Sequence, residues 1–297
     1  MSSALVPSAR RHRQVIATRE TLELLPEPRR VRRGAVRALA VTTGRPFTLG
    51  DVRLELFPSG AMVGAASLLV DHGLRRIVYA GAVNTRPGLL AGAAEVRACD
   101  VLIIDATFAR FRYPMAAAVL DELAAWIERV RVAGDTAVVL APPLTVAPEV
   151  LRRLGGLGSI RAHRAVAAAA RRLARLGIEL PPAPRLAGPS AAGDIVVCPP
   201  AHREAPGVAD LPRARFALIS GFAGDPAVAA RLRVEAAFPF SEAAGGDDLL
   251  DYVAQSGART VHLLAYLAGG PDIARTLADR GLVVRRLGPP EQLRLPL

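Results

Sequence analysis

Residues 52–71 read VRLELFPSGAMVGAASLLVD, two short apolar runs joined by a glycine-bearing segment. Runs of this length and composition, bounded by turn residues, are typical of strands. Gly60 and Gly64 in the joining segment favour a tight turn, because a residue without a side chain permits close approach of the backbone. The stretch therefore predicts two strands joined by a glycine hinge, in which Ala61 carries no polar group.

The pattern on either side of this hinge alternates between strand-like and helix-like segments. Between Tyr113 and Val130 the apolar residues recur every three or four positions, which predicts an amphipathic helix that ends near Gly134. Strands are predicted at 76–80, 101–105, 136–142, 194–199, 215–221, 260–266 and 282–287, a loop at 180–194, and further helices at 147–154, 163–176, 245–257 and 271–281. Strands that alternate with helices indicate α/β layering, here with a helical insertion in mid-chain.

The composition excludes several classes of protein. A chain of 297 residues that is 51% hydrophobic is long enough to bury a large core, in one domain or two. No stretch approaches the roughly 18 apolar residues that span a bilayer, and the N-terminus has no signal-peptide core. Cys99 and Cys198 are far apart, so neither a disulfide scaffold nor a thiolate zinc site is predicted. We expect a cytoplasmic protein.

The charge is strongly basic, with a formal net charge of +11, and all 38 basic residues are arginine. Arginine suits phosphate, and a basic surface attracts nucleic acid through counterion release. An arginine-rich chain without lysine also fits a GC-rich genome, with its arginines solvated on helix faces, so both interpretations stay open. The candidate nucleic-acid-binding residues are Arg10, Arg11, Arg13, Arg29, Arg30, Arg32 and Arg33.

Six short motifs follow one another along the chain: PSGAMVGAA (58–66), YAGA (79–82), DATF (105–108), SGF (220–222), SEAAGGDDLL (241–250) and LLAYLAG (263–269). Their order resembles the metallo-β-lactamase-fold nucleases of the β-CASP group, in particular bacterial exonucleases associated with RNA processing or with DNA ligases. The resemblance implies a metallo-β-lactamase-like αββα sandwich, shortened at its N-terminus and formed by residues 1–108 and 236–297. A smaller β-CASP-like α/β insertion would occupy residues 109–235.

The resemblance also implies where a metal site would lie. Proteins of this group hold two zinc ions, which bind a bridging hydroxide that attacks phosphorus. The ligand positions that can be matched downstream are Ala61, Ala82, Ala243 and Ala265. A further ligand loop, projected back from RHRQVIATRET (11–21), falls on Ser3, Leu5, Pro7 and Ser8. A zinc ligand needs an imidazole, thiolate or carboxylate lone pair, so we expect both zinc ions to be lost.

Few polar residues remain for chemistry. Asp105 matches the acid of the third motif and is the best surviving catalytic candidate, but a carboxylate that caps a neighbouring turn is the preferred interpretation. Ser241 with Glu242, and Asp247 with Asp248, are predicted to be helix-entry residues. No two histidines have a metal-ligand spacing; His262 should face away from residue 265 and be a satisfied histidine. No nucleophile elbow or P-loop is present.

The functional hypotheses follow from these losses. The first is a catalytically silent relative of metal-dependent exonucleases that binds nucleic acid, DNA or RNA, or that pairs with an active relative or with a second copy of itself. The alternative is an active metal-dependent phosphodiesterase or nuclease, in which Asp105, His262 and either Asp71 or His72 converge on one metal. A third, a decayed chain without a role, conflicts with the ordered amphipathic pattern.

Overall fold

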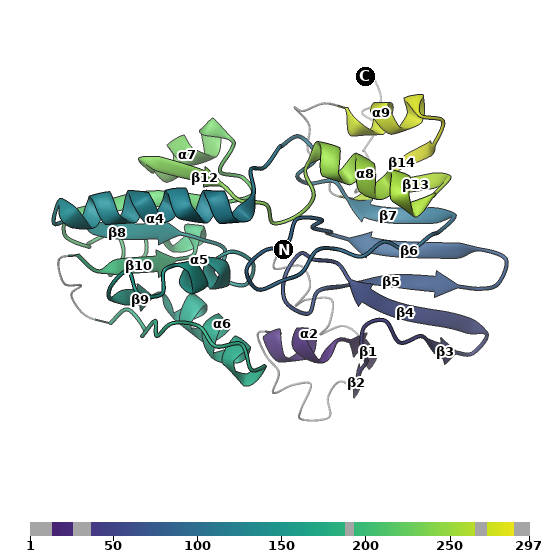
Figure 1. Cartoon of the computed structure of the whole chain (residues 1–297), viewed down its shortest axis with the longest axis horizontal. Coiled ribbons are helices and arrows are strands. Elements are labelled where there is room, and N and C mark those ends of the chain that lie inside the picture. Colours follow the sequence, from purple (N-terminus) through teal and green to yellow (C-terminus); the bar gives the residue numbers. More distant parts are fainter. Residues whose placement is uncertain (1–13, 26–36, 188–192, 265–271, 288–297) are drawn as a thin grey trace, which may run out of the picture.

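The computed structural model describes residues 14–25, 37–187, 193–264 and 272–287, and contains two large β-sheets that lie beside one another (Figure 1). Each sheet has its own hydrophobic core and its own helices. The predicted α/β class is confirmed. No helix in the described ranges has the length and apolar character needed to span a membrane.

The seven-stranded sheet has the strand order β14-β13-β7-β6-β5-β4-β3. Its strands are β3 (Phe47–Leu49), β4 (Val52–Pro58), β5 (Ala66–Asp71), β6 (Arg76–Gly81), β7 (Val101–Asp105), β13 (Thr260–Leu264) and β14 (Val283–Leu287). Strands β3 to β6 pair antiparallel, whereas β6, β7, β13 and β14 run parallel. Helices α8 (Gly246–Ser256) and α9 (Ile273–Asp279) cover one face, and Leu249 and Tyr252 of α8 pack there against Val78, Leu102 and Val261 (Figure 1).

The opposite face of this sheet also carries apolar side chains. None of the described helices packs on that face. The register places Tyr79, Ile103 and His262 side by side on that face. Tyr79 is 50% exposed, and the hydrophobic cluster that includes this sheet contains only residues of the helix-covered face. We call this the uncovered sheet face and define it by its apolar residues Phe47, Leu49, Val52, Leu54, Leu56, Leu68, Val70, Ile77, Tyr79, Val101, Ile103, Leu264, Val283 and Leu287. Of these, Leu56 is 8% exposed.

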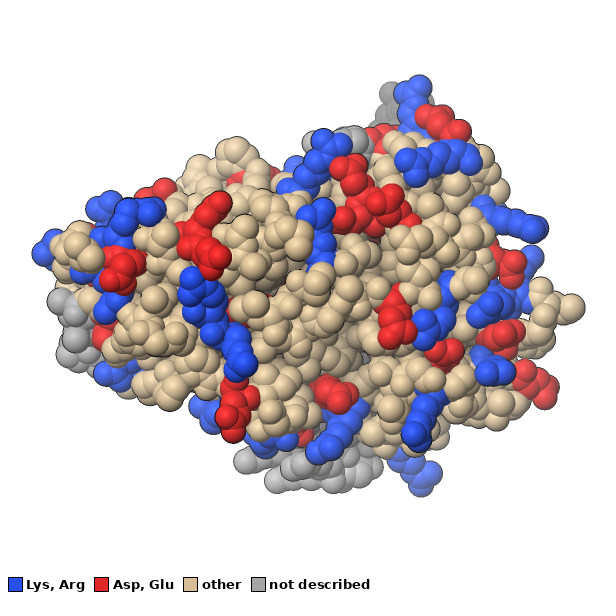
Figure 2. Space-filling view, in the orientation of Figure 1, with Lys and Arg blue, Asp and Glu red and all other residues tan. Residues whose placement is uncertain are grey.

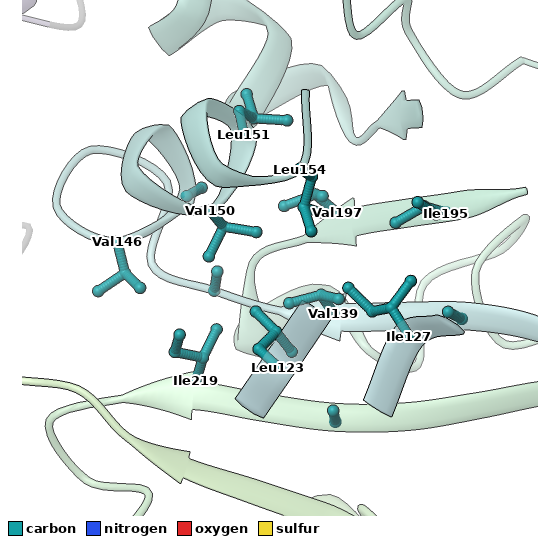
Figure 3. Packing of buried hydrophobic residues seen from close by; sticks show 14 of the residues in the cluster. Leu123, Ile127, Val139, Val146, Val150, Leu151, Leu154, Ile195, Val197 and Ile219 are labelled. Atoms are coloured by element: carbon teal, nitrogen blue, oxygen red, sulfur yellow. The ribbon is translucent and has the colours of Figure 1, made fainter. Parts of the chain in front are cut away.

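The five-stranded sheet is entirely parallel, with the order β12-β11-β8-β10-β9. Its strands are β8 (Thr136–Leu140), β9 (Ile160–Ala162), β10 (Ile195–Cys198), β11 (Ala214–Ser220) and β12 (Ala236–Pro239). Helices α4 (Ala116–Val132), α5 (Ala147–Arg153) and α6 (Arg164–Arg175) pack on one face. Figure 3 shows this core, in which the labelled side chains include Leu123, Ile127, Val139, Val150, Val197 and Ile219. Helix α7 (Pro226–Leu232) and residues 200–211 cover the other face.

The N-terminal elements form a small separate layer. Strands β1 (Gln14–Ala17) and β2 (Arg37–Ala40) pair parallel, and the six-residue helix α2 (Arg19–Leu24) packs near α6. Thr18 caps α2, and its hydroxyl donates a hydrogen bond of 2.7 Å to the carbonyl of Gly64. Local periodicity did not predict these short elements.

The glycine hinge between β4 and β5 is confirmed. Gly60 and Gly64 both have positive φ, at 70° and 74°. A Cβ atom on Gly60 would lie 2.1 Å from the backbone oxygen of Asn84, and one on Gly64 would lie 2.2 Å from Cβ of Glu20. Both positions therefore require glycine for two reasons, the backbone conformation and the close approach.

The predicted division into a body of residues 1–108 and 236–297 and an insertion of residues 109–235 stays a prediction. Strand β12 begins at Ala236 and pairs with β11, so the five-stranded sheet extends as far as Pro239. The chain then returns to the seven-stranded sheet through α8.

Candidate functional site

The candidate site lies where the two sheets meet. The carboxyl ends of the parallel strands β6, β7 and β13 point toward the carboxyl ends of β8 and β11 (Figure 1). Asp105 ends β7, Ala82 and Gly221 follow β6 and β11, and Ala243 follows β12. Ala82 and Ala243 belong to one hydrophobic cluster in this region. The structure thus brings together two of the positions at which the resemblance expects zinc ligands.

Aromatic rings fill the space beside these two alanines. Ala82 and Ala243 pack against a set that we call the aromatic cluster, namely Phe108, Phe111, Tyr113 and Phe222. The ring centroids of Phe108 and Phe222 are 4.8 Å apart, and the ring of Tyr113 meets Phe108 edge-on at 6.3 Å.

The loops are shaped to accept these rings. A Cβ atom on Gly221 would lie 2.4 Å from Cε1 of Phe108, so Phe108 packs directly on the backbone of that residue. The Tyr113 hydroxyl donates a 2.8 Å hydrogen bond to the Gly221 carbonyl, and burial raises the pKa of Tyr113 above its ordinary value. These contacts make the aromatic cluster a packed core and not an open pocket.

The third matched position, Ala61, borders a cavity of about 20 Å³, whose lining also includes Asn84, Arg86, Thr145 and Glu242. A cavity of that size holds about one water molecule. A hydrolytic centre needs room for the metal ions, the attacking water and the substrate. The volume beside Ala61 does not provide that room.

The polar groups around this cavity are engaged with one another. The Glu242 carboxylate accepts hydrogen bonds from the Thr145 hydroxyl at 2.6 Å and from the Gly221 N–H at 2.9 Å. Asn84 donates to the Ser241 carbonyl at 3.3 Å and accepts from the Ser241 hydroxyl at 3.2 Å. Because Asn84 follows β6 and Ser241 follows β12, these bonds join the two halves of the molecule.

An arginine strengthens the same junction. Arg86 makes a bidentate pair with Asp248, with Nε–Oδ2 at 2.7 Å and Nη2–Oδ1 at 3.1 Å, and also donates to the Tyr113 carbonyl at 2.8 Å. The hydrogen bond with Asp248 raises the pKa of Arg86 above its ordinary value. Nearby, Arg110 pairs with Asp225. Both arginines are thus held by carboxylates, although Nε of Arg110 is buried and has no hydrogen-bond partner among the described residues.

Glu149 is a buried carboxyl on α5. It accepts hydrogen bonds from the N–H groups of Leu89 at 2.6 Å and Leu90 at 3.1 Å. Burial raises the pKa of Glu149 above its ordinary value, although these N–H groups act in the opposite direction. These hydrogen bonds connect α5 to the loop that follows β6.

The predicted turn-capping role of Asp105 is confirmed, since its Oδ1 accepts a 2.7 Å hydrogen bond from the N–H of Thr107. Asp247 and Asp248 lie in the first turn of α8, as predicted. The prediction for Ser241 and Glu242 is wrong. Helix α8 begins only at Gly246, and both side chains are buried in the junction because they satisfy partners from the facing loops.

The residues of the altered-site alternative do not converge. His262 pairs in register with Ile103, so it shares a sheet face with Asp105. Asp71 pairs with Arg76 at the start of β6, which places it about 15 Å along the strands from Asp105. His262 is also not the satisfied histidine that was expected: its Nδ1 is buried and has no hydrogen-bond partner among the described residues.

Other predicted site residues fall outside the described ranges. They are Ser3, Leu5, Pro7, Ser8 and Ala265 among the ligand positions, and Arg10, Arg11, Arg13, Arg29, Arg30, Arg32 and Arg33 among the nucleic-acid candidates. Within the described part of the chain, no group of three or more His, Cys, Asp or Glu side chains is arranged to hold a metal ion.

The aromatic cluster was not predicted from the motifs. Phe108 and Phe222 each stand at the end of a recognised motif, DATF and SGF, and Phe111 and Tyr113 follow within five residues of the first. Four aromatic residues beside two matched motifs form a signal that could have been found. Their mutual packing depends on the approach of β7 and β11, which lie in different sheets.

The fold and the site together define an α/β protein of two facing sheets whose interface is closed by aromatic packing and hydrogen bonds. Residues 4–140 match the family model described as a Beta-lactamase superfamily domain. The predicted metallo-β-lactamase-like α/β fold is thereby confirmed.

One curated relative extends this likeness through most of the chain. It is described as a probable DNA ligase of Opitutus terrae and is 30% identical over 249 residues, which cover 82% of this chain. The same alignment covers 24% of the ligase, so the chain spans about a quarter of the length of that relative.

Proposed function

We propose that this chain is a non-hydrolytic relative of the metallo-β-lactamase-fold nucleases and that it acts by binding DNA. The observation that carries the proposal is the packing of Ala82 and Ala243 against the aromatic cluster. Where a zinc-binding relative would hold imidazole or carboxylate groups, this chain has methyl groups in van der Waals contact with rings. Metal coordination at these positions would require both new ligands and an emptied space.

Hydrolysis in such enzymes depends on an activated water molecule. Two metal ions make a hydroxide available at neutral pH and absorb the charge that develops on the phosphate. The described side chains nearest the site, Glu242, Arg86 and Asn84, already satisfy protein partners. A group that activates a water molecule must be free to approach it, and these three are not.

The choice of DNA rests on charge and on the relative. The chain has a net charge of +11, which favours association with a polyanion. The relative is described as a probable DNA ligase. Figure 2 shows basic and acidic side chains interspersed on the viewed face, around a largely uncharged centre. The proposed DNA contacts are the arginines at 10–13 and 29–33, which lie outside the described residues.

Catalytic silence is tested by metal analysis of freshly purified protein, together with a nuclease assay on end-labelled DNA supplemented with zinc or manganese. We expect less than stoichiometric metal and no cleavage above a buffer control. Tightly bound stoichiometric metal, combined with cleavage that Asp105→Ala abolishes, would instead establish the altered-site hydrolase.

DNA binding is tested by fluorescence anisotropy over a salt series. Replacing Arg29, Arg30, Arg32 and Arg33 together by glutamine should weaken binding and reduce the slope of log K against log salt, by roughly 0.9 for each phosphate that is no longer neutralised. The single variant Arg171→Gln is the control for the loss of one positive charge outside this segment. A salt slope that the fourfold variant leaves unchanged would refute this assignment of the DNA-binding arginines.

One observation favours a second candidate function, that of a non-catalytic subunit. The uncovered sheet face is largely apolar, with His262 and Arg285 as polar neighbours, and Tyr79 on it is half exposed. Seven strands spaced about 4.8 Å apart and about five residues long give roughly 500 Å² per molecule. Two copies that pack face to face would bury about 1,000 Å², the lower limit for a specific interface. The proposed occupant of this face is a second copy of the chain.

A further inference from the structure

A pocket of about 380 Å³ lies in the five-stranded sheet, at the carboxyl ends of β9 and β10. His163 directly follows β9 and caps α6, its Nδ1 accepting a 3.2 Å hydrogen bond from the N–H of Ala165. His202 ends the short 3₁₀ helix η1 (Pro200–His202), which follows β10. The two imidazole rings meet with their centroids 4.3 Å apart.

The topology explains why the sheet opens here. After β9 the chain enters α6, whose Val166 packs with Val139 on one face of the sheet. After β10 it enters residues 200–211, whose Val208 packs with Val138 on the other face. Neighbouring parallel strands whose connections leave to opposite faces create a crevice at their carboxyl ends. Ligands of open α/β sheets bind in such crevices.

The lining of this pocket has an excess of positive charge. Arg164 and Arg185 both border it, and neither has an ion-pair partner among the described residues. The closest acidic side chain in sequence, Glu204, is engaged with Arg203. Burial lowers the pKa of His163 below its ordinary value, and the positive charges of His202, Arg164 and Arg185 lower it further. The site therefore presents cationic groups without a counter-ion of its own.

The start of helix α6 also favours an anion. The pocket is lined by His163 and Arg164 at the N-terminus of this 12-residue helix, where the helix dipole attracts negative charge. His163 caps one N–H group of the first turn, that of Ala165. Nδ1 of His202 is buried and has no hydrogen-bond partner among the described residues, so this atom is not a proposed contact of the ligand.

We propose that this pocket binds a phosphomonoester group, with Arg164 and Arg185 as the cationic contacts. The planar fork of arginine matches the oxygen atoms of phosphate, and two arginines balance its two negative charges. The volume is within the range of small-molecule sites, and Leu186, Pro206 and Val208 provide an apolar wall. The phosphate is thus expected to carry an organic group of about nucleotide size.

Binding at this pocket does not depend on catalytic silence or on binding of duplex DNA elsewhere. A free nucleotide and the end of a nucleic-acid strand present the same phosphomonoester, so the chemistry of the site is common to both. The pocket opens on the end of the five-stranded sheet that faces the junction, with β10 two strands from β11. A strand end held here would lie about 10 Å from the loop that follows β11.

Isothermal titration calorimetry with the full chain tests the proposal. The probes are inorganic phosphate, thymidine 5′-monophosphate, and one oligothymidylate with either a 5′-phosphate or a 5′-hydroxyl, all at matched ionic strength in chloride. We expect saturable binding of the thymidine monophosphate. Arg164→Gln and Arg185→Gln should each weaken it by about tenfold or more, because each removes a charge-assisted hydrogen bond. Arg171→Gln, on the same helix, is the matched control and should bind like the wild type.

The pattern of probes identifies the source of the phosphate. Preference for the 5′-phosphorylated strand over the 5′-hydroxyl strand would assign the pocket to a strand end. Binding of the monophosphate or of phosphate without that preference would assign it to a free metabolite. Two results would overturn the proposal: no saturable binding of any phosphate probe, or binding that both arginine variants retain. Both arginines are exposed, so thermal unfolding should verify that the variants fold.

Discussion

At the scale of single residues, the candidate site depends on methyl groups in contact with rings. Ala243 is 4% exposed and packs with Phe108 and Tyr113, and Ala82 packs on the same aromatic cluster. Interiors of this kind are close-packed, so a larger side chain must displace its neighbours. The surroundings of His163 also matter, because burial and nearby cations lower its pKa below the ordinary value.

Ala243→His tests whether a single ligand can restore a metal site. We expect no gain of bound zinc and a loss of about 1–3 kcal/mol in the free energy of unfolding, because the ring overpacks the aromatic cluster. Urea denaturation and metal analysis measure the two effects. Ala278→His, on the exposed side of α9, is the control and should cost less than about 1 kcal/mol. Stoichiometric zinc in Ala243→His would contradict the prediction.

His163→Asn tests the electrostatics of the phosphate pocket. The pKa of His163 is lowered from 6.5 in the folded chain, so the unfolded chain binds the proton more readily. The contribution to stability is therefore complete above pH 6.5 and decreases as the pH falls through that value toward the folded pKa. Asparagine retains the helix cap but does not titrate.

Unfolding free energies at about pH 7.5 and about pH 5.5, on either side of the ordinary histidine pKa, should show the difference. The wild type should lose more stability between these values than His163→Asn does. Equal losses in the two proteins would show that the imidazole is not perturbed. Added phosphate should reduce the loss in the wild type, since it favours the protonated ring.

At the scale of secondary-structure elements, the hinge between β4 and β5 determines where the loops of the site lie. Its backbone passes so close to the loop after β6 that Asn84 both meets Gly60 and reaches Ser241. The N–H of Asn84 also donates a 2.8 Å hydrogen bond to the carbonyl of Ser59. A change in the hinge is thus transmitted to the junction between the sheets.

Gly60→Ala, compared with a control glycine, separates the energetic cost of steric overlap from the cost of a positive φ. Gly73 has a similar φ of 78°, but no heavy atom lies within 4 Å of the point that a Cβ would occupy, so Gly73→Ala is the matched control. The control should cost about 1–2 kcal/mol for the left-handed backbone alone. Gly60→Ala should cost about 1–3 kcal/mol more than the control, because its Cβ would overlap the Asn84 carbonyl. Chemical denaturation measures the free energy of unfolding of both variants. Similar losses in Gly60→Ala and Gly73→Ala would show that the loop after β6 moves to accommodate the Cβ atom.

At the scale of the whole molecule, the two sheets differ in how they are covered. The five-stranded sheet has packed elements on both faces, whereas the described helices of the seven-stranded sheet pack on one. Apolar surface that stays in water costs about 25 cal/mol per Å², so a second layer on the uncovered sheet face would be stabilising.

Tyr79→Glu tests self-association through the uncovered sheet face. We expect the wild type to form a dimer at micromolar concentrations and the variant to remain a monomer, because a charge buried between two apolar sheets is unfavourable. Light scattering coupled to size-exclusion chromatography measures the mass. Leu74→Glu, at a 97% exposed position in the β5–β6 turn, is the control and should behave like the wild type. A wild type that stays monomeric would rule out a second copy as the occupant.

The sequence by itself determined the features that depend on neighbouring residues. The period of apolar residues predicted α4 within a few positions of its observed bounds, and short apolar runs predicted β4 to β7. The two glycines in the joining segment predicted a tight turn at Gly60 and Gly64, and both have positive φ. Asp105 was correctly expected to cap its own turn. Each of these features is decided by a few consecutive residues, so local patterns are enough to predict them.

Only the tertiary structure decided what surrounds the alanines at the matched ligand positions. Phe108 packs on Phe222 and Thr145 bonds to Glu242, although each pair is separated by a long stretch of chain. His163 and His202 have no recognisable spacing, yet their rings meet because β9 and β10 are parallel neighbours. These interactions depend on which strands pair and on how two sheets face each other, and local sequence patterns carry no information about such long-range geometry.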